Sequence, residues 1–232
     1  MVLRSVNPAT GQELERFREF TKAQVDAAID RAVRAFAKWR RTDFSERAER
    51  MHAVAAGLRA RKRRYGEAMA REMGKPIREG IAETEKCAWA ADYFADNAAA
   101  FLADEAIPTE ASRSFVRYEP IGPILAVMPW NFPFWQVFRF ATPNLMAGNV
   151  ALLKHASNVM RCSLEIEGVF TEAGFSKGVF QSLVLGSGAI PPLVRDPRIR
   201  GVTLTGSDAA GAAVGGDAGA SVKKTVLELG GS

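Results

Sequence analysis

The sequence has 232 residues, enough for one large domain or two smaller ones. Hydrophobic residues make up 47% and charged residues 25%, which excludes a disordered tail, a collagen-like repeat and a coiled-coil rod. No apolar run reaches the roughly 18 residues of a membrane helix, and the N-terminus lacks the apolar core of a secretory signal. The two cysteines, Cys87 and Cys162, form neither a disulfide framework nor a zinc motif. We therefore expect a cytoplasmic protein without membrane contact or bound metal.

The net charge of +5 is concentrated near the N-terminus. Residues 1–80 carry 19 Lys and Arg against 11 Asp and Glu, and the densest basic run covers residues 59–64. A nucleic-acid site would need stacking aromatic residues or a recognisable reading motif, and only Tyr65 is adjacent. We expect a solvated basic helix face and no nucleic-acid partner, with nucleic-acid binding as the minor alternative.

Residues 21–103 have the spacing of helices. Thr21 is a plausible N-cap for a first helix, because apolar residues follow it at intervals of three and four. Ser45 is the expected cap of a second helix, which runs to Met73 and is stopped by Gly74 and Pro76. A third helix is expected over residues 79–103.

After Pro108, short β-rich runs alternate with helical stretches. This alternation predicts an α/β fold with a doubly wound, Rossmann-like parallel sheet. The expected strands are 114–118, 124–128, 150–153, 179–185, 202–205 and 225–229, and the expected helices are 133–147, 158–173, 188–195 and 207–218.

A proline-bracketed amide follows the strand at 124–128. Pro129 and Pro133 enclose Asn131, and the carboxyl ends of strands in open α/β sheets are where ligands bind. Prolines stiffen the turn, so Asn131 is a candidate donor to a developing oxyanion. The alternative is an Asx-turn residue with no ligand.

The strand at 150–153 delivers Lys154, which can reach a ribose hydroxyl or a phosphate. The alternative is a solvent-exposed lysine without a ligand. Ser157 or Asn158 is the expected cap of the following helix. His155 has no second histidine or acidic partner arranged for a metal, so we expect a structural role for it.

Two glycine turns are candidate phosphate sites. Gly186 and Gly188 begin a dinucleotide-binding pattern, but its third glycine position is Pro191, which weakens the signal. Gly206 and Ser207 lead from a strand into a helix, where free N–H groups and a hydroxyl can cradle a phosphate. The alternative for Ser207 is an ordinary helix cap.

Glu228 lies between two leucines at the end of the last expected strand. Partial desolvation there would raise the pKa of its carboxyl toward that of a useful general base. The alternative is an ordinary salt-bridged glutamate at a sheet edge.

The order and spacing of these segments resemble the aldehyde dehydrogenase superfamily over essentially all 232 residues. The stretch Lys154–Asn158 is most similar to the bacterial succinate-semialdehyde dehydrogenase branch. The segments that carry the resemblance are Asn7-Pro8-Ala9-Thr10-Gly11, Pro129-Trp130-Asn131-Phe132-Pro133, Ala147-Gly148-Asn149-Val150, Leu153-Lys154, Leu204-Thr205-Gly206-Ser207 and Leu227-Glu228-Leu229-Gly230-Gly231.

The resemblance implies a role for each matching residue. Asn131 would donate to the oxyanion of a thiohemiacetal, and Glu228 would be the general base. Lys154 would bind the adenosine ribose of NAD or NADP. The other residues implied at the cofactor are Trp130, Ser157, Gly186, Gly206, Ser207 and Gly230.

Position 157 bears on the choice between NAD and NADP. Family members that prefer NAD often carry Glu here, where it binds the ribose 2′-hydroxyl, whereas this sequence has Ser157. A neutral residue does not repel a 2′-phosphate, so the resemblance implies that NADP is tolerated or preferred.

The sequence departs from the family in its cysteines. The family's nucleophile follows the Glu-Leu-Gly-Gly segment by a few dozen residues, whereas Cys87 and Cys162 precede it and are expected to be buried hydrophobes. We therefore expect a fragment: residues 1–108 as a helical part of the cofactor domain, residues 109–232 as its Rossmann-like part, and no catalytic domain. The full-length enzyme would be a homo-oligomer that acts on a small aldehyde, and the fragment alone would be inactive. The alternative is a short, non-catalytic nucleotide-binding or oligomer-capping module.

Overall fold

The computed structural model describes residues 2–230. They form an α/β fold built on one five-stranded parallel sheet. The strand order is β7-β6-β5-β8-β9, so the chain starts at the centre, builds one side, and then crosses to the other. This doubly wound order confirms the predicted fold class. The strands are β5 (Pro123–Met128), β6 (Val150–His155), β7 (Phe180–Ser182), β8 (Gly201–Thr205) and β9 (Lys224–Glu228).

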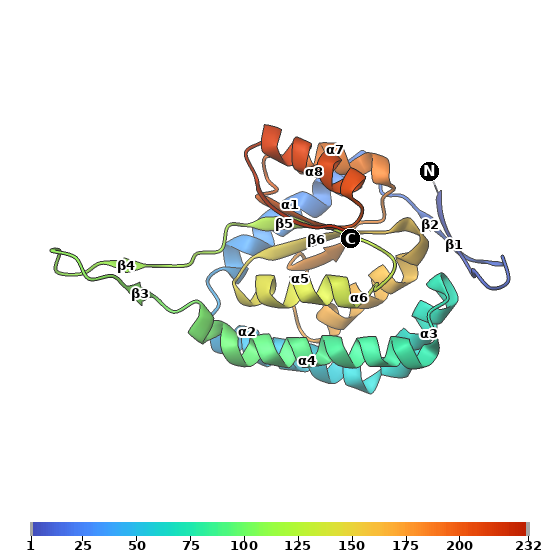
Figure 1. Cartoon of the computed structure of the whole chain (residues 1–232), viewed down its shortest axis with the longest axis horizontal. Helices are drawn as coiled ribbons and strands as arrows, with labels where there is room; N and C mark the ends of the chain where they lie inside the picture. Colours follow the sequence, from blue (N-terminus) through green and yellow to red (C-terminus); the bar gives the residue numbers. More distant parts are fainter. Residues whose placement is uncertain (1, 231–232) are drawn as a thin grey trace.

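Helices cover both faces of the sheet (Figure 1). One face carries α5 (Trp135–Met146) and α6 (Met160–Glu172), and the other carries α1 (Lys22–Trp39), α7 (Ile190–Arg195) and α8 (Asp208–Ala220). A third layer packs on α5 and α6 from outside, and it consists of α2 (Phe44–Ala60), α3 (Lys62–Met73) and α4 (Ile77–Phe101). None of the helices within residues 2–230 is long and apolar enough to cross a membrane.

The N-terminal helices follow the expected pattern with one correction. Thr21 caps α1, with its side chain accepting the Gln24 N–H. The second helix is capped by Asp43, not Ser45, because the Asp43 carboxylate accepts the Glu46 N–H at 2.8 Å. It also breaks at Arg61 into α2 and α3. Gly74 ends α3 with a φ of 77°, as predicted.

Two antiparallel hairpins lie outside the parallel sheet. The strand expected at 114–118 is the short β4 (Phe115–Val116), which pairs with β3 (Glu105–Ala106) in a hairpin that projects from the body (Figure 1). Its placement in the parallel sheet was wrong, because the few residues between it and β5 leave no room for a crossover helix. The unpredicted strands β1 (Val2–Val6) and β2 (Glu13–Arg18) form the other hairpin.

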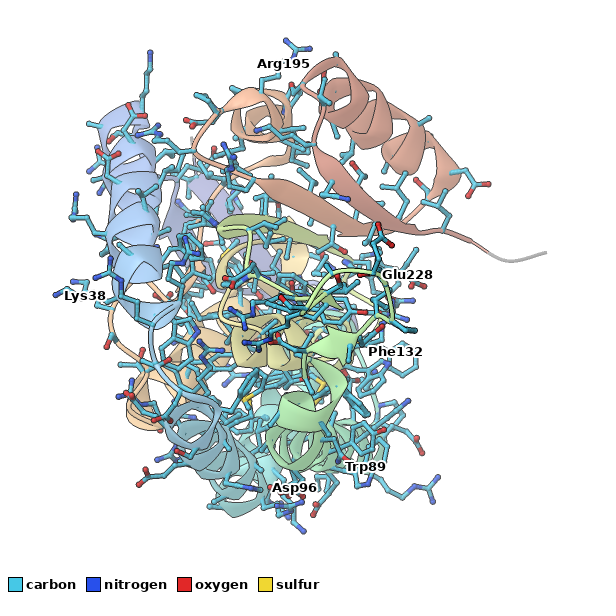
Figure 2. The ribbon with its side chains drawn as sticks, turned by 90° about the vertical axis from the view of Figure 1, so that its left-hand side faces the viewer. Lys38, Trp89, Asp96, Phe132, Arg195 and Glu228 are labelled. Carbon is cyan, nitrogen blue, oxygen red and sulfur yellow. The ribbon has the colours of Figure 1, made fainter. Side chains whose placement is uncertain are left out.

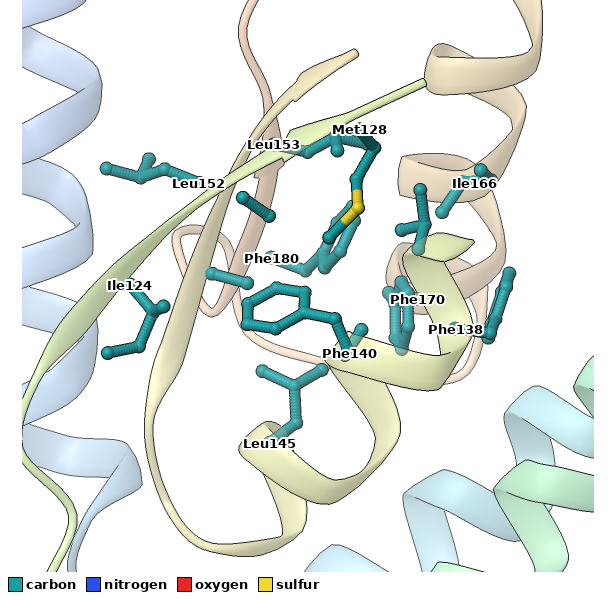
Figure 3. Packing of buried hydrophobic residues seen from close by; sticks show 14 of the residues in the cluster. Ile124, Met128, Phe138, Phe140, Leu145, Leu152, Leu153, Ile166, Phe170 and Phe180 are labelled. Carbon is teal, nitrogen blue, oxygen red and sulfur yellow. The ribbon is translucent and has the colours of Figure 1, made fainter. Parts of the chain in front are cut away.

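Stacked phenylalanines fill the core between the sheet and α5 and α6 (Figure 3). The ring of Phe170 stacks on Phe180 with centroids 4.4 Å apart, and on Phe138 at 5.3 Å. All three side chains are buried, and each such pair adds about 1 kcal/mol beyond its buried area. This packing fixes α5, the helix that follows Asn131, against the sheet.

Two buried carboxylates of the outer layer cap helices of the inner layer. Glu83 of α4 accepts the N–H groups of Phe134 and Trp135 at the start of α5, each at 2.9 Å. Glu72 of α3 accepts the N–H groups of Arg161 and Cys162 at the start of α6. The expected capping of this helix by Ser157 or Asn158 was therefore wrong: a carboxylate from a distant helix takes that position.

A buried arginine, Arg47, donates hydrogen bonds to the free carbonyl groups at helix C-termini. The guanidinium of Arg47 donates to the carbonyl oxygens of Trp39 at the end of α1, of Thr42 three residues later, and of Met146 at the end of α5. Burial lowers its pKa, but the partial negative charge of two helix ends replaces a carboxylate partner. Gly148 has a φ of +90°, which L side chains rarely adopt, and a Cβ there would lie 3.0 Å from Arg47 Nη2, so a substitution would strain the backbone and displace the guanidinium.

Candidate functional site

The carboxyl edge of the parallel sheet gathers the candidate site residues. The loop with Asn131 follows β5, Lys154 is near the end of β6, and Gly206 follows β8. The register pairs Met128 with His155 and Thr205 with Glu228, so these strand ends lie level with one another. The strand order reverses between β5 and β8, which is where open α/β sheets form a ligand crevice.

Asn131 lies exposed in the proline-bracketed loop after β5. Its Oδ1 accepts the N–H of Phe132 at 3.1 Å, which fixes the direction of the amide group. The Nδ2 group has no acceptor within residues 2–230 and remains available as a donor. The geometry agrees with an oxyanion donor and also with the simpler turn residue that the sequence left open.

His155 anchors this loop to β6. Its Nδ1 accepts the Ala156 N–H at 2.8 Å, so Nε2 carries the proton and donates to the carbonyl oxygen of Pro133 at 2.9 Å. Complete burial lowers the pKa of His155 to about 4, and the ring is neutral near pH 7. The histidine thus has the structural role that the sequence suggested.

Lys154 is a buried cation without a close partner. Only 5% of it is exposed, and its ammonium group makes no hydrogen bond or ion pair with the part of the chain that the structure describes. Burial lowers its pKa, and Glu19 favours its charged form. The same Glu19 accepts the N–H of Gly186 at 3.4 Å, so the ends of β6 and β7 face one carboxylate. The exposed-lysine alternative is therefore wrong.

At the start of α8, fewer groups are free to bind a phosphate than the sequence predicted. The N–H of Gly206 donates to the Glu228 carbonyl oxygen at 3.0 Å, and the Ser207 hydroxyl accepts the Ala210 N–H as an N-cap. These two groups are therefore used within the chain and do not form a free cradle. The backbone N–H groups of Ser207 and Asp208 have no acceptor within residues 2–230 and point out of the helix end, where an anion is favoured.

Glu228 lies in an exposed ion pair, with 49% of its side chain accessible and Oε2 3.3 Å from Arg139 Nη2. The predicted desolvation was wrong, because every residue of β9 is exposed. The salt-bridged alternative describes its environment. Figure 2 shows Glu228 on the same side of the molecule as Phe132, next to Asn131 in the chain.

A cavity of about 310 Å³ lies between α5 and the strands β5, β8 and β9. Gln136 and Arg139 of α5 and Glu228 line it, and the Oε1 atom of Gln136 is buried without a donor within residues 2–230. Sequence reasoning missed Arg139. Its only signal was its place on the helix after Asn131, three residues beyond Gln136 and on the same helix face.

The sequence profile of the Aldehyde dehydrogenase family matches residues 1–232. The chain belongs to the aldehyde dehydrogenase family. It is 49% identical over its full length to a probable NADP(+) succinate-semialdehyde dehydrogenase of Synechocystis, and 51% identical to NADP(+) succinate-semialdehyde dehydrogenase 1 of Mycobacterium tuberculosis. It covers 51% of each relative, so it spans about half their length.

A solved aldehyde dehydrogenase structure supports the same assignment. The succinic semialdehyde dehydrogenase of Streptococcus pyogenes, determined with NADP+, superposes with a TM-score of 0.96 at 37% identity. The match covers 99% of this chain and 50% of the other. The predicted family, the Rossmann-like fold and the correspondence to the N-terminal half of family members are thereby confirmed.

Neither cysteine of this aldehyde dehydrogenase chain is placed for attack on a substrate. Cys87 and Cys162 are both fully buried, and burial raises the pKa of each thiol well above its ordinary value. A thiol with a raised pKa and no access to solvent is a poor nucleophile. Residues 2–230 also contain no group of three or more His, Cys, Asp or Glu side chains that could hold a metal ion.

Proposed function

We propose that this chain is the NADP+-binding part of a succinate-semialdehyde dehydrogenase, with residues 1–108 as its helical part and residues 109–232 as its Rossmann-like part. The observation that carries the proposal is Lys154, a buried cation without a close partner at the carboxyl edge of the sheet. The names of the relatives and the NADP+ complex of the S. pyogenes enzyme support the cofactor and the substrate.

The residues at the carboxyl edge suit a dinucleotide. The Lys154 ammonium group binds a ribose hydroxyl or the 2′-phosphate, and the free N–H groups at the start of α8 face the pyrophosphate. The dinucleotide supplies the hydride acceptor when bound. We also assign to its binding surface Trp130, Ser157, Gly186, Gly206, Ser207 and Gly230.

On the aldehyde side, Asn131 donates from Nδ2 to the oxygen that becomes negative during attack on the carbonyl. Glu228 takes a proton from the nucleophile or from water. Arg139, which forms an ion pair with Glu228, supplies a cation to the single carboxylate of succinate semialdehyde, whose charge distinguishes it from simple aldehydes. The nucleophile comes from outside residues 1–232, since both cysteines of the chain are buried.

The cofactor proposal is tested at Ser157, a half-buried residue three positions after Lys154. We expect the chain to bind NADP+ more tightly than NAD+. Ser157→Glu should weaken NADP+ binding about 10-fold or more, because its carboxylate repels the 2′-phosphate, and should maintain or improve NAD+ binding. Calorimetric titration with each dinucleotide measures both affinities.

Ser157→Ala is the matched control, since it removes the hydroxyl without adding charge and should leave NADP+ preferred. Equal affinity for the two dinucleotides in the wild-type chain, unchanged by Ser157→Glu, would contradict the proposal. Loss of all dinucleotide binding in Lys154→Met, with its unfolding temperature kept, would support the assignment of the buried cation.

A further inference from the structure

A second cavity, of about 570 Å³, opens at the amino edge of the sheet, away from the proposed cofactor site. It lies between the second half of α1, the start of α2 and the turn before β7. Figure 2 shows Lys38, which lines it, on the opposite side of the molecule from Glu228 and Phe132. Its charged lining residues are Arg31, Arg34, Lys38, Glu46, Arg50 and Lys177.

Most of these cations lack a carboxylate partner. Arg34, Lys38 and Lys177 are exposed and make no ion pair or hydrogen bond with the residues that the structure describes. Arg31 donates to the neutral amide oxygen of Gln181 at 2.6 Å. Only Arg50 has an acidic partner at the cavity, Glu46 at 2.5 Å.

A further carboxylate near the cavity already has a hydrogen-bond partner. The charges of Arg31 and Lys177 act to lower the pKa of the Glu167 carboxyl. This side chain is largely buried, however, and accepts the Ser182 N–H at 3.2 Å. Burial raises its pKa despite the two cations. The cavity therefore carries more positive than negative charge, and an anion within it would offset the mutual repulsion of the cations.

The densest basic run of the sequence contrasts with this cavity. Arg59 pairs with Asp92 at 2.6 Å, Lys62 with Glu85 at 2.5 Å, and Arg63 with Glu67 at 2.9 Å. The remaining two, Arg61 and Arg64, pair with Glu172 and Glu165. Residues 59–64 thus hold no unmatched charge, whereas the cavity at the amino edge does.

We propose that this basic cavity binds a small polyphosphate, either free or as the phosphate chain of a nucleotide. The guanidinium groups of Arg31 and Arg34 present planar donor forks that match phosphate oxygens, and Lys38 and Lys177 add compact cations. The volume lies within the range of small-molecule sites. The cavity's tryptophan, Trp39, is buried and gives no stacking platform, which favours a small anion over a nucleic-acid strand.

The test is a calorimetric titration of the chain with inorganic triphosphate and, separately, with ATP, each in the presence of saturating NADP+. If the proposed function holds, the NADP+ keeps the ligands out of the cofactor site; the cavity variants below assign the binding to the amino edge whether or not it holds. We expect both ligands to bind, with affinity that falls as salt rises. Equal affinities identify the phosphate chain as the whole ligand, and tighter binding of ATP identifies a nucleotide.

The variant Arg34→Ala/Lys38→Ala should lose about 10-fold or more in affinity. Both side chains are exposed and form no hydrogen bond or ion pair with residues 2–230, so folding should be preserved, which thermal unfolding verifies. The matched control Lys62→Ala/Arg63→Ala removes two charges from paired, exposed positions and should bind like wild type. Absence of binding, equal affinity in both double variants, or tighter binding of a single-stranded RNA oligomer than of triphosphate would overturn the proposal.

Discussion

Single buried side chains determine the shape of the carboxyl edge. His155 makes no contact with solvent, yet its Nε2–H group bonds to the Pro133 carbonyl oxygen, two residues after Asn131. The loop that carries the proposed oxyanion donor is therefore fixed to the neighbouring strand. A neutral imidazole is required, because Nδ1 must accept the Ala156 N–H at the same time.

This requirement makes stability depend on pH. The pKa of His155 is lowered to about 4 in the folded chain, below the ordinary value of 6.5, so the unfolded state takes up a proton first as pH falls. The contribution of His155 is complete above pH 6.5 and is lost between there and pH 4. Between pH 7 and pH 5 we expect a loss of about 2 kcal/mol in the free energy of unfolding.

Urea unfolding at the two pH values measures this loss. His155→Gln keeps a donor for the Pro133 carbonyl oxygen but does not titrate, so its loss should be smaller by about that amount. His52→Gln removes the chain's other imidazole, which is exposed. This variant should lose as much free energy of unfolding between pH 7 and pH 5 as the wild type does. An identical pH dependence in wild type and His155→Gln would contradict the assignment.

At the residue scale, sequence patterns predicted the positions of the candidate site residues better than they predicted the burial and contacts of those residues. Lys154 was found because a lysine follows a buried strand, but neither its burial nor the nearby charge of Glu19, 135 residues earlier in the chain, could be predicted from that pattern. Glu228 was expected to be desolvated by its leucine neighbours, whereas β9 is exposed along its length. Arg139 was missed because its contact with Glu228 spans 89 residues of chain.

Helix ends are where the outer helical layer meets the inner one. Glu83 and Glu72 supply negative charge to the N-termini of α5 and α6, and Arg47 supplies positive charge to the C-termini of α1 and α5. Each charge lies at the end of a helix dipole that favours its sign. Three buried charged side chains, whose burial would be costly without partners, thereby have hydrogen-bond partners.

Glu72→Gln tests this arrangement. The carboxylate accepts the Arg161 N–H with one oxygen and the Cys162 N–H with the other, and an amide has only one acceptor oxygen. One buried N–H would lose its partner, and the charge at the start of α6 would disappear. We expect the free energy of unfolding to fall by about 2 kcal/mol in urea titrations.

Glu67→Gln is the control on the same helix, because Glu67 is exposed and, within residues 2–230, has an ion pair with Arg63 alone. It should change stability by less than about 0.5 kcal/mol. If the two variants are equally stable, the buried carboxylate contributes no more than an exposed one, and the proposed capping role fails.

At the element scale, periodicity predicted most helices and the presence of all five parallel strands, but not the order of the strands in the sheet. The break at Arg61 escaped detection because residues 59–64 are good helix formers on both sides of it. The strand expected at 179–185 is only β7 (Phe180–Ser182), since the apolar residues beyond it are buried without pairing as a strand. The cap on α6 could not be predicted, because Glu72 lies 89 residues before Arg161.

At the scale of the whole molecule, we expect the chain to bind the cofactor without catalysing aldehyde oxidation. The carboxyl edge offers Lys154 and the start of α8 to a dinucleotide, whereas the only thiols of the chain are buried. The 232-residue chain should therefore bind NADP+ and yet produce no NADPH from succinate semialdehyde. Absorbance at the NADPH band measures turnover, and the succinic semialdehyde dehydrogenase of S. pyogenes provides the positive control.

NADPH formation by a pure sample of verified mass would contradict this expectation and would require a nucleophile within the chain. Cys162→Ser and Cys87→Ser would then identify it. Absence of both turnover and dinucleotide binding would instead contradict the proposed function itself, so the two failures are distinguishable.

The buried charges at the helix ends also limit how this protein can be recombined. A chimera that takes residues 1–108 from one relative and the remainder from another would divide the Glu83, Glu72 and Arg47 contacts between two parents. Helices of matching length and hydrophobicity would not suffice, because each carboxylate must meet backbone N–H groups at one particular turn. Crossovers between relatives should therefore succeed where both parents carry acidic residues at 72 and 83 and a basic residue at 47, and fail where either parent lacks them.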